Sequence, residues 1–471
     1  MAEKGANERN PRPGSYVSGS RRGVLMTGKK SLLMTISLGI LLAGAGAGLC
    51  EDPVSLRDLA ENALLTHEKI AQTDSNVRRA EARIRLARSV LMPSLELNGT
   101  TTWYGDEATL DLSPTDSFVI RPSNDWGWSA DVQQTLFSGL RPWRAKNVAL
   151  LQRDQALLER TTTANNLVLD VAAAFLRATA DTQRVDVARS NLEQIESQLT
   201  VANRRFEVGE TAAADVARWR AERAAAYQRQ VVAEGDAAMS LRYLERLTGS
   251  GTIEALAPLQ GIPAPEGTDE QLVDQALGTR LEVATLEHQL EAAGLMIKIE
   301  KGGWLPEVTA KAQYYKQKAA FPSQDWTSVA LTATVPVWDG GRTAARVAEA
   351  REDLRQVEFL KRDVFRGIAN QVDAAAIGHR AAVAADEAAE ERVDAAREAY
   401  RQVERAYRVG ENSATDLLTT TTEQIDAETA AIIAGAQREY QAIALRHAIG
   451  LSPLPDLDPL AILAAQANAE E

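Results

Sequence analysis

The pentapeptide Phe206–Glu210 (FEVGE) recurs 201 residues later as Tyr407–Glu411 (YRVGE). Three further pairs of segments keep this offset: Leu136–Gly139 with Val337–Gly340, Asp215–Val216 with Asp416–Leu417, and Leu247–Gly249 with Ala448–Gly450. Upstream, Pro93 corresponds to Pro306 at an offset of 213, so the first copy carries 12 extra residues between its proline and its glycine. This register indicates that one structural unit is written twice in the chain.

The stretches that end at the repeated glycines are predicted to be very long helices. Between Gly139 and Gly209, and between Gly340 and Gly410, the only proline is Pro142, which falls in the first helical turn, where its missing N–H costs nothing. Apolar residues of the second copy recur mostly three or four apart, at Val347, Leu354, Val357, Leu360, Val364, Ile368 and Val372. A helix of about 65 residues would be about 100 Å long. Periodicity alone would also fit a noncatalytic coiled-coil scaffold of the cell envelope.

Four segments before these helices alternate between apolar and polar residues, which argues against a plain rod. They are Ser94–Tyr104, Trp126–Phe137, 307–314 and 328–337. In the last segment the apolar positions are Val329, Leu331, Ala333, Val335 and Val337. Strands of about 10 to 12 residues with one apolar and one polar face are typical of a transmembrane β-barrel with a wet interior. Each copy therefore reads helix, two strands, very long helix, turn, helix.

The tryptophans support a membrane position for these strands. Six of the eight lie at or near predicted strand ends: Trp103, Trp126, Trp128, Trp304, Trp326 and Trp338. Indole rings gather where a barrel meets the lipid headgroups. The 12-residue excess of the first copy falls in the loop of about Gly105 to Asp125, and long loops in such barrels face the cell exterior.

Four strands cannot close a barrel, and each unpaired N–H or C=O group at an open sheet edge costs several kcal/mol in hydrocarbon. Three protomers would give 12 strands, whereas two would give eight strands and an interior filled with side chains. The predicted fold is an α+β membrane protein with an internal duplication. Its homotrimeric 12-stranded β-barrel, with four strands per protomer, continues into a long α-helical coiled-coil tunnel.

The first 50 residues are predicted to be an export signal. The basic residues Arg21, Arg22, Lys29 and Lys30 precede the apolar run Ser31–Leu49. A membrane anchor is the alternative for this run. Cys50 is a candidate for lipidation, although the leucine before it departs from the usual small residue. The predicted organisation is a signal at 1–50, a first repeat at 51–251, a linker at 252–267, a second repeat at 268–451 and a C-terminal tail at 452–471.

Composition argues against several other functions. The formal net charge is -13 and the chain presents no basic face, so a nucleic-acid partner is not expected. One cysteine and four widely separated histidines give neither a disulfide framework nor a local metal site. Gly302–Gly303 and Gly340–Gly341 lack the spacing and the lysine of a phosphate-binding loop. We therefore expect no catalytic residue, no cofactor and no enzyme activity.

The repeated motifs together resemble the TolC-like outer-membrane efflux protein family from about Pro53 to Pro453. They are the strand starts at Leu91–Leu95 and Trp304–Pro306, the strand ends at Phe137–Gly139 and Trp338–Gly340, and the two Val-Gly-Glu turns. The resemblance implies a trimeric barrel in outer-membrane lipid with a helical tunnel through the periplasm. It also implies a periplasmic adaptor (membrane fusion) protein and an inner-membrane pump of the RND or ABC class. The expected function is the outer-membrane channel of a tripartite export system, with a type I protein-secretion duct as the alternative.

The resemblance also assigns roles to residues at the ends of the long helices. It places Val208, Gly209, Glu210, Val409, Gly410 and Glu411 at periplasmic tips that dock the adaptor. Glycine can take the left-handed conformation that ends a helix, and Thr211 or Ser413 can begin the next one, so these residues could also be caps alone. By similarity Asp215 and Asp416 lie inside a closed periplasmic gate, and Tyr407 links neighbouring helices with Asp215 as a candidate partner. Thr419 stands where the family often has a second aspartate.

Overall fold

The computed structural model describes residues 53–114, 116–259, 261–319 and 324–470, without the side chains of residues 112, 116 and 466–470. The predicted signal of residues 1–50, with Cys50, lies outside this part of the chain. The division into two repeats and a linker stays a prediction.

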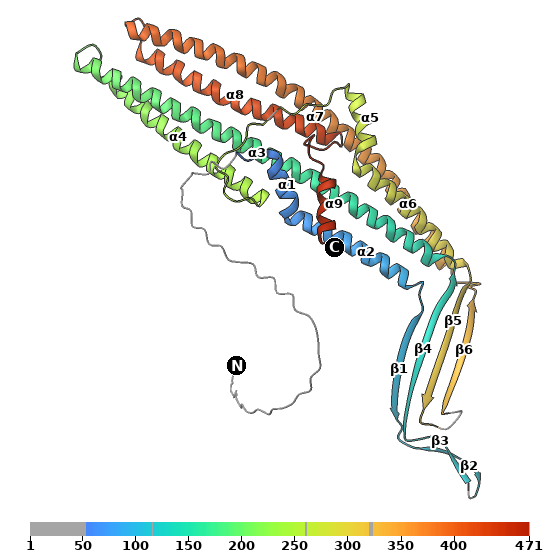
Figure 1. The fold of residues 1–471 in the computed structure, drawn as a ribbon. Helices are drawn as coiled ribbons and strands as arrows, with labels where there is room; N and C mark the ends of the chain where they lie inside the picture. Colours follow the sequence, from blue (N-terminus) through green and yellow to red (C-terminus); the bar gives the residue numbers. More distant parts are fainter. Residues whose placement is uncertain (1–52, 115, 260, 320–323, 471) are drawn as a thin grey trace, which may run out of the picture. The chain divides into compact units, whose positions relative to one another are not determined.

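The two copies follow the same order of main elements, apart from an extra hairpin in the first copy and a 3-10 turn in the second (Figure 1). The first copy contains α1 (Leu56–Thr66), α2 (Glu68–Ser89), β1 (Ser94–Trp103), β2 (Ala108–Ser113), β3 (Asp116–Arg121), β4 (Asn124–Ser138), α3 (Arg141–Glu207) and α4 (Ala213–Thr248). The second contains α5 (Asp269–Thr279), α6 (Leu281–Lys301), the 3-10 turn η1 (Gly302–Trp304), β5 (Glu307–Gln317), β6 (Asp325–Thr334), α7 (Arg342–Val409) and α8 (Ala414–Ala448). A last helix, α9 (Pro459–Glu470), follows.

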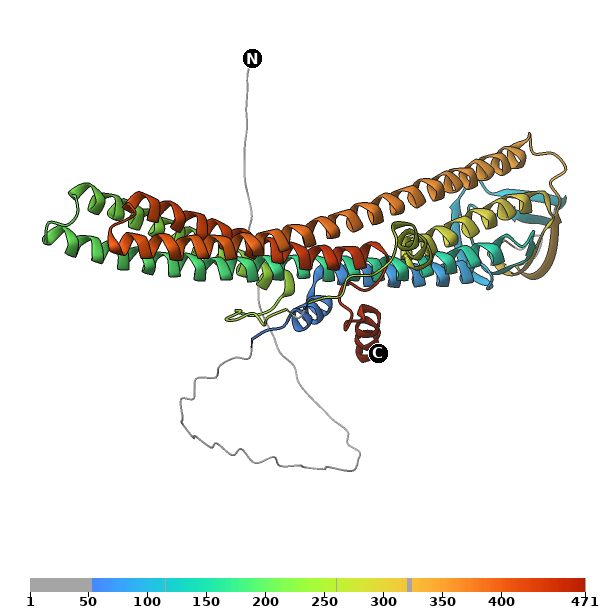
Figure 2. The ribbon, with the colours of Figure 1, turned by 90° about the horizontal axis from the view of Figure 1, so that it is seen from above.

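The predicted long helices are confirmed, because α3 has 67 residues and α7 has 68. Pro142 lies in the first turn of α3, as its position in the sequence predicts. Each long helix turns back at its end into an antiparallel partner, α4 or α8, and the two resulting hairpins run side by side (Figures 1 and 2). In the described part of the chain, every helix is either too short or too polar to serve as a membrane span.

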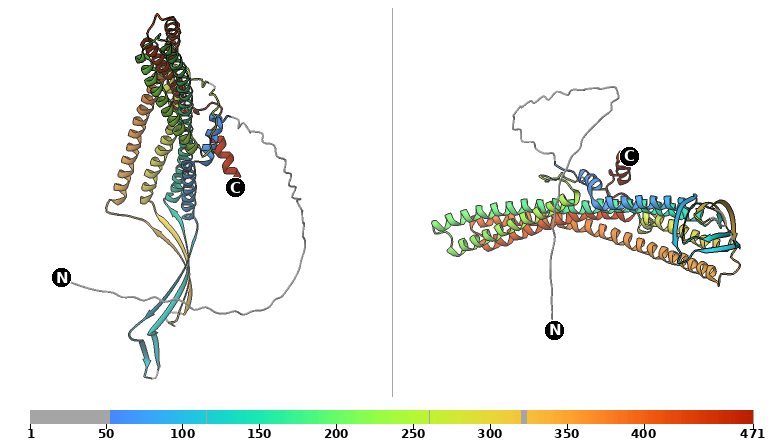
Figure 3. Two further views of the ribbon diagram at one scale, coloured as in Figure 1. Left: turned by 90° about the vertical axis from the view of Figure 1, so that its left-hand side faces the viewer. Right: turned by 90° about the horizontal axis from the view of Figure 1, so that it is seen from below.

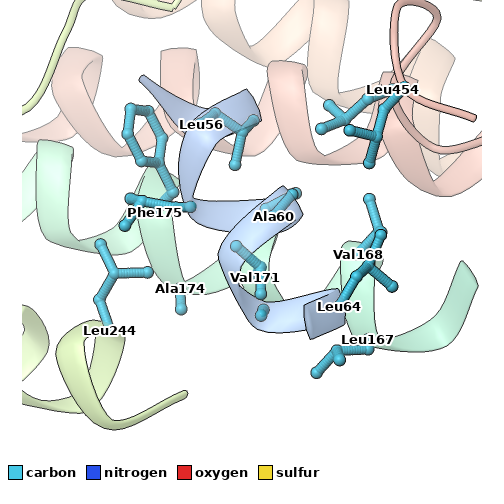
Figure 4. Packing of buried hydrophobic residues seen from close by; sticks show 14 of the residues in the cluster. Leu56, Ala60, Leu64, Leu167, Val168, Val171, Ala174, Phe175, Leu244 and Leu454 are labelled. Carbon is cyan, nitrogen blue, oxygen red and sulfur yellow. The ribbon is translucent and has the colours of Figure 1, made fainter. Parts of the chain in front are cut away.

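The middle of α3 carries the largest apolar core. Short helix α1 lies across it, and the end of α4 and the segment before α9 close the cluster (Figure 4). Phe175 of α3 and Leu64 of α1 are fully buried there, and Leu454 packs from the C-terminal segment. Burying each such side chain contributes about 1.5 to 3 kcal/mol relative to leaving it exposed. The short helices and the tail are thereby fixed to the long helix.

The four predicted strands form one antiparallel sheet in the order β1-β4-β5-β6. Its register aligns the apolar positions across all four strands: Leu97 lies opposite Ala130, Ala130 opposite Tyr314, and Ala310 opposite Leu331. The large apolar residues of this face are exposed in the protomer, among them Leu95, Leu97, Val132, Val329 and Leu331.

The other face of the sheet is polar and centred on Asp131 of β4. Its carboxylate accepts hydrogen bonds from Ser129 at 2.6 Å and from Asn98 of β1 at 3.1 Å. The ammonium group of Lys311 on β5 lies 2.9 Å from the same carboxylate. This network joins β4 of the first copy to β5 of the second.

Two details of the sheet differ from the sequence prediction. The last strand ends at Thr334, so the prediction that it reaches Val337 was wrong. Pro336 explains the early end, because proline has no N–H for the ladder and restricts the residue before it. A β-bulge between Thr135 and Phe137 puts Phe137, and not Leu136, opposite Val308 on the apolar face, while Gln134 lies opposite Ala310 as a polar residue on that face.

The long loop of the first copy contains a separate hairpin, β2-β3, which the sequence did not predict. Leu110 lies opposite Phe118 in it, and both side chains are exposed. The guanidinium group of Arg121 stacks over the ring of Tyr104, 4.7 Å from its centroid, at the base of the hairpin. The side of the membrane that this loop faces stays a prediction.

Where the helices meet the sheet, their order repeats the order of the strands (Figure 3). Helix α2 leads into β1, β4 leads into α3, α6 leads into β5 through η1, and β6 leads into α7. In this region α2 packs on α3, α3 on α6, and α6 on α7. One edge of the protomer is therefore made by α2 and β1, and the other by α7 and β6.

Candidate functional site

The ends of the two helical hairpins adopt the same backbone turn. Gly209 has a φ of 80° and Gly410 a φ of 83°, both in the left-handed region. The N–H of Glu210 donates to the carbonyl of Arg205 at 2.8 Å, and the N–H of Glu411 donates to the carbonyl of Ala406 at 2.9 Å. This six-residue bond is the Schellman pattern that ends helices at glycine. The prediction that these glycines end the long helices is confirmed.

The six predicted tip residues lie at the surface of these turns. Val208 and Val409 are 71% and 72% exposed, and the glycine and glutamate after each valine are also exposed. Two exposed valines at matching positions place an apolar group at the end of each hairpin.

The second helix of each hairpin begins differently. Ser413 begins α8 with a capping box: its hydroxyl accepts from the N–H of Asp416 at 3.2 Å, and its own N–H donates to the Asp416 carboxylate at 3.0 Å. In the first hairpin the cap residue is Ala212, which has no side-chain oxygen, so the prediction for Thr211 was wrong. The Thr211 hydroxyl instead donates to the Asp215 carboxylate at 2.9 Å.

Hydrogen bonds from Ser413 favour the ionised form of Asp416. The Ser413 hydroxyl donates to its carboxylate at 2.7 Å, and together with the backbone N–H it lowers the pKa of Asp416 below its ordinary value. Asp416 is exposed in the protomer. Thr419 is exposed one turn further along α8, and its hydroxyl donates to the carbonyl of Thr415.

An aromatic pair connects the two hairpins below the tips. Tyr407 of α7 is only 7% exposed and packs against Trp219 of α4, with 6.4 Å between ring centroids. Both belong to a cluster that includes Ile195 of α3 and Leu417 of α8. The cluster draws on all four helices, so Tyr407 links the hairpins through its ring.

Two arginines that the sequence analysis missed also bridge the hairpins. Arg205 of α3 donates to the carbonyls of Tyr407 at 3.3 Å and Arg408 at 2.9 Å, the last carbonyls of α7. Its guanidinium carbon lies 5.2 Å from the centroid of the Tyr407 ring. Arg218 of α4 donates to the Asp215 carboxylate and to the Thr415 hydroxyl of α8, both at 3.2 Å.

These contacts have a structural role, because they hold the two hairpins together. A cation at the C-terminal end of a helix is favourable because the last carbonyls carry partial negative charge. Within the described ranges, His, Cys, Asp and Glu side chains form no group of three or more that could hold a metal ion. The arrangement can dock a partner at the exposed turns and hold two hairpins together beneath them.

Comparison with known proteins identifies relatives of this chain. A family model described as outer membrane efflux protein matches residues 59–250 and 272–451. The toluene efflux pump outer membrane protein TtgF of Pseudomonas putida is 28% identical over 268 residues, which is 55% of this chain and 54% of TtgF. The alkaline protease secretion protein AprF of Pseudomonas aeruginosa is 26% identical over 301 residues, covering 61% of this chain and 62% of AprF. The chain thus spans about half the length of TtgF.

A solved structure has the same fold. The CmeC outer membrane channel of Campylobacter jejuni superposes with a TM-score of 0.72 over 92% of this chain and 98% of CmeC, at 12% sequence identity. At that identity the likeness concerns the fold alone.

Proposed function

The chain belongs to the outer membrane efflux protein family, and from that premise we propose that three copies form a channel that exports substrates across the outer membrane. The sheets of the three copies close a 12-stranded barrel in outer-membrane lipid, and the helices continue it as a tunnel through the periplasm. The channel takes its substrates from an inner-membrane pump through a periplasmic adaptor. It catalyses no reaction of its own.

The observation that carries this proposal is the exposed apolar face of the four-stranded sheet. Leu97 of β1 and Leu331 of β6 lie on the same face and are exposed in the protomer. Monomeric soluble proteins rarely expose a large continuous apolar patch, whereas lipid covers such a face at no cost. The face centred on Asp131 is polar, as the water-filled side of a barrel requires.

The aromatic residues support the same orientation. Trp103 of β1 and Trp126 of β4 lie on the apolar face, at the end of the sheet that is remote from the long helices. Trp326 of β6 lies at the same end but opposite Tyr315, on the polar face. Trp304 and Trp338 lie at the opposite end, next to the starts of β5 and α7. The exposed rings of Trp103 and Trp126 at one end and of Trp304 and Trp338 at the other fit the two lipid headgroup regions.

The two edges of the protomer support ring closure. Both edge strands of the described sheet, β1 and β6, pair along one side only. The edge helices beside them also expose apolar side chains, Leu86 on α2 and Phe359 and Leu360 on α7. Because the edges differ, the contact between copies is head to tail, and such contacts form a ring when the rotation closes.

The hairpin ends support the docking role. Each presents an exposed Val-Gly-Glu turn, and three copies would place six turns at the periplasmic mouth. Asp215, Tyr407 and Asp416 lie just beneath these turns, where they would shape the gate. Opening such a gate within a protomer has to break the Arg205 and Arg218 contacts between the hairpins.

Single-channel conductance of the purified protein in a planar bilayer tests this function. We expect heat-resistant trimers that conduct, with fewer or smaller channels when the sheet is disrupted by Leu331→Arg but not by Thr332→Arg, its neighbour on the polar face. Trimers that never conduct would favour the coiled-coil scaffold. A type I secretion duct is the second candidate because of the likeness to AprF. If the channel and its pump export a protein and not a small toxic compound, the type I secretion duct is the correct function.

A further inference from the structure

The polar face of the sheet carries an aromatic pair that contact with lipid headgroups does not explain. Trp326 of β6 lies opposite Tyr315 of β5, and their ring centroids are 5.3 Å apart with 33° between the ring planes. The register places both residues on the face of Asp131, which the proposed barrel turns toward water. The pair therefore lies on the wall of the channel and not on the lipid side.

A glycine of the neighbouring strand explains the position of the Tyr315 ring. Gly127 of β4 lies diagonally opposite Tyr315, and a Cβ atom added to it would lie 2.5 Å from the phenol oxygen. Any side chain at position 127 would therefore displace the ring. An aromatic ring that covers a strand glycine helps to fix the register of a sheet. This packing gives Tyr315 a structural role, but it does not account for Trp326.

The indole ring of Trp326 is open to the water-filled side. The residue is 39% exposed in the protomer, and Tyr315 is half-buried beside it. Ring closure would place β1 of the next copy beside β6. The polar face of β1 has no large apolar side chain that could cover the indole, since it consists of Ser94, Glu96, Asn98, Thr100 and Thr102. A molecule in the channel can therefore reach the ring.

The charged side chains of this face favour a positively charged ligand. Glu307, next to the long helices, forms an ion pair with Arg141. The other charged residues of the face are Glu96, Asp125, Asp131 and Lys311. The ammonium group of Lys311 is bound to Asp131, so Glu96 and Asp125 leave an excess of negative charge. A passage lined by charge of one sign concentrates ions of the opposite sign.

One of these carboxylates lies close to the aromatic pair. Asp125 is two residues from Gly127 on the same face of β4, a rise of roughly 7 Å along the strand. Its carboxylate accepts a hydrogen bond from the N–H of Ala319 at 3.3 Å, just beyond the end of β5. Tyrosine and tryptophan rings also attract cations to their faces. Two ring faces and a carboxylate thus occur together at this end of the sheet.

We propose that Tyr315 and Trp326 form a binding site in the channel wall for a cation that carries an aromatic ring, such as an aromatic ammonium ion. The ring of the ligand packs on the exposed indole, and its charge lies near the ring faces and Asp125. Three copies would place three such sites around the lumen. Binding stays weak, because a channel conducts only when its ligands leave again. The place of the site in a channel rests on the proposed function.

The apolar face of the same sheet provides a matched control. Trp128 of β4 packs against Tyr314 of β5, and their ring centroids are also 5.3 Å apart. Trp128 and Trp326 are both 39% exposed in the protomer. The two pairs differ in the face on which they lie, so replacing either tryptophan by leucine removes an equally exposed ring from one face only.

Block of single-channel current in a planar bilayer tests the proposal. Phenyltrimethylammonium, or tetramethylammonium as an ion of equal charge without a ring, is added to the side opposite the protein. The polar hairpins stay on the side of addition, so the blocker meets the barrel first. We expect the phenyl ion to block the parent at a concentration at least about fivefold lower than tetramethylammonium. Trp326→Leu should abolish this difference, Trp326→Phe should keep most of it, and Trp128→Leu should keep all of it.

Equal block of the parent by the two ions would overturn the aromatic site and leave charge as the only attraction. This comparison needs no variant, so it holds even where a variant does not fold. A preference for the phenyl ion that survives Trp326→Leu, or that Trp128→Leu abolishes as well, would also overturn the site. A parent that conducts without such a preference refutes the site alone. A parent that never conducts refutes the channel function, and with it any site in the channel wall.

Discussion

The two hairpin tips share one backbone turn and its Val-Gly-Glu residues, but they differ in the side chains that pack beneath it. Phe206 is 47% exposed, whereas its counterpart Tyr407 is 7% exposed. Trp219, fully buried in the first hairpin, corresponds to Thr420 in the second. The turn itself depends on a glycine and a hydrogen-bond pattern that the duplication preserved, while the packing beneath it diverged. The first hairpin supplies Trp219, Arg205 and Arg218, and these three side chains contact α7 and α8 of the second hairpin.

The first turns of α4 and α8 also differ in their side chains. Four consecutive threonines of α8, Thr419–Thr422, stand where α4 has Arg218–Ala221. Each threonine hydroxyl donates to the carbonyl four residues earlier. Such bonds slightly destabilise helices and often bend them. The second hairpin thus combines a good cap at Ser413 with a weaker first two turns, and it relies on the first hairpin for its position.

The largest difference between the tips is expected at Trp219. Trp219→Ala should cost about 3 to 5 kcal/mol, because it removes a fully buried ring from the cluster that joins four helices. Thr420→Ala, at the matching position, should change stability by no more than about 0.5 kcal/mol. Hydrogen exchange of the tip amides measures both effects. Similar exchange rates in the two variants would show that Trp219 does not hold the hairpins together.

The two turns should be destabilised alike when their glycines are replaced. Gly209→Val and Gly410→Val each force a β-branched residue into the left-handed region, at a cost of about 1 to 3 kcal/mol. Both should disrupt docking and export while leaving trimers in the membrane. Gly367→Ala, inside α7 with no atom within 4 Å of the added carbon, is the control and should be neutral or stabilising. Limited proteolysis measures how well the turns are formed, and we expect faster cleavage at the tips of the valine variants. Tips that resist cleavage in either valine variant would show that the turn does not require a positive φ.

The contacts of Arg205 with the end of α7 should contribute less to the stability of the tips than the turns do. Arg205→Gln removes a cation from the last carbonyls of α7 and should cost about 1 kcal/mol. Arg204→Gln changes the exposed neighbouring arginine and serves as the matched control. We expect more leak through the closed channel in the Arg205 variant alone, measured as resting conductance in a planar bilayer. Equal leak in both variants would mean that the Arg205 contacts do not restrain the gate.

The sequence alone predicted the features that depend on residue spacing and on turn residues, and it missed the contacts between residues that are far apart in the chain. The duplication, the two long helices, the four strands and the turns at Gly209 and Gly410 all follow from repeated motifs and alternating residues. Arg205 and Arg218 were missed because each contacts a residue about 200 positions away in sequence, and nothing nearby marks either arginine as different from the many on helix surfaces. The wrong cap at Thr211 has a local cause: threonine there bonds to Asp215 while Ala212 starts the helix.

The smallest expected difference between the tips is their response to acid. Hydrogen bonds from Ser413 lower the pKa of Asp416 below its ordinary value of 3.8 in the folded protein. A carboxyl group whose pKa falls on folding stabilises the fold above its ordinary pKa, and that contribution is lost as the pH falls through the lower, folded pKa. The start of α8 should therefore loosen in acid, and Asp416→Asn should loosen it already at neutral pH because an amide weakens the charge-assisted half of the capping box. Asp215→Asn is the matched change in the first hairpin, where Ala212 makes no side-chain cap, so the start of α4 should respond less. Amide exchange at the starts of α8 and α4, followed from neutral pH downwards in both variants, measures the difference after correction for the intrinsic pH dependence of exchange. If α4 loosens in acid as much as α8, the capping box does not distinguish the two tips, and the reliance of the second hairpin on the first has to rest on Trp219 and the arginines.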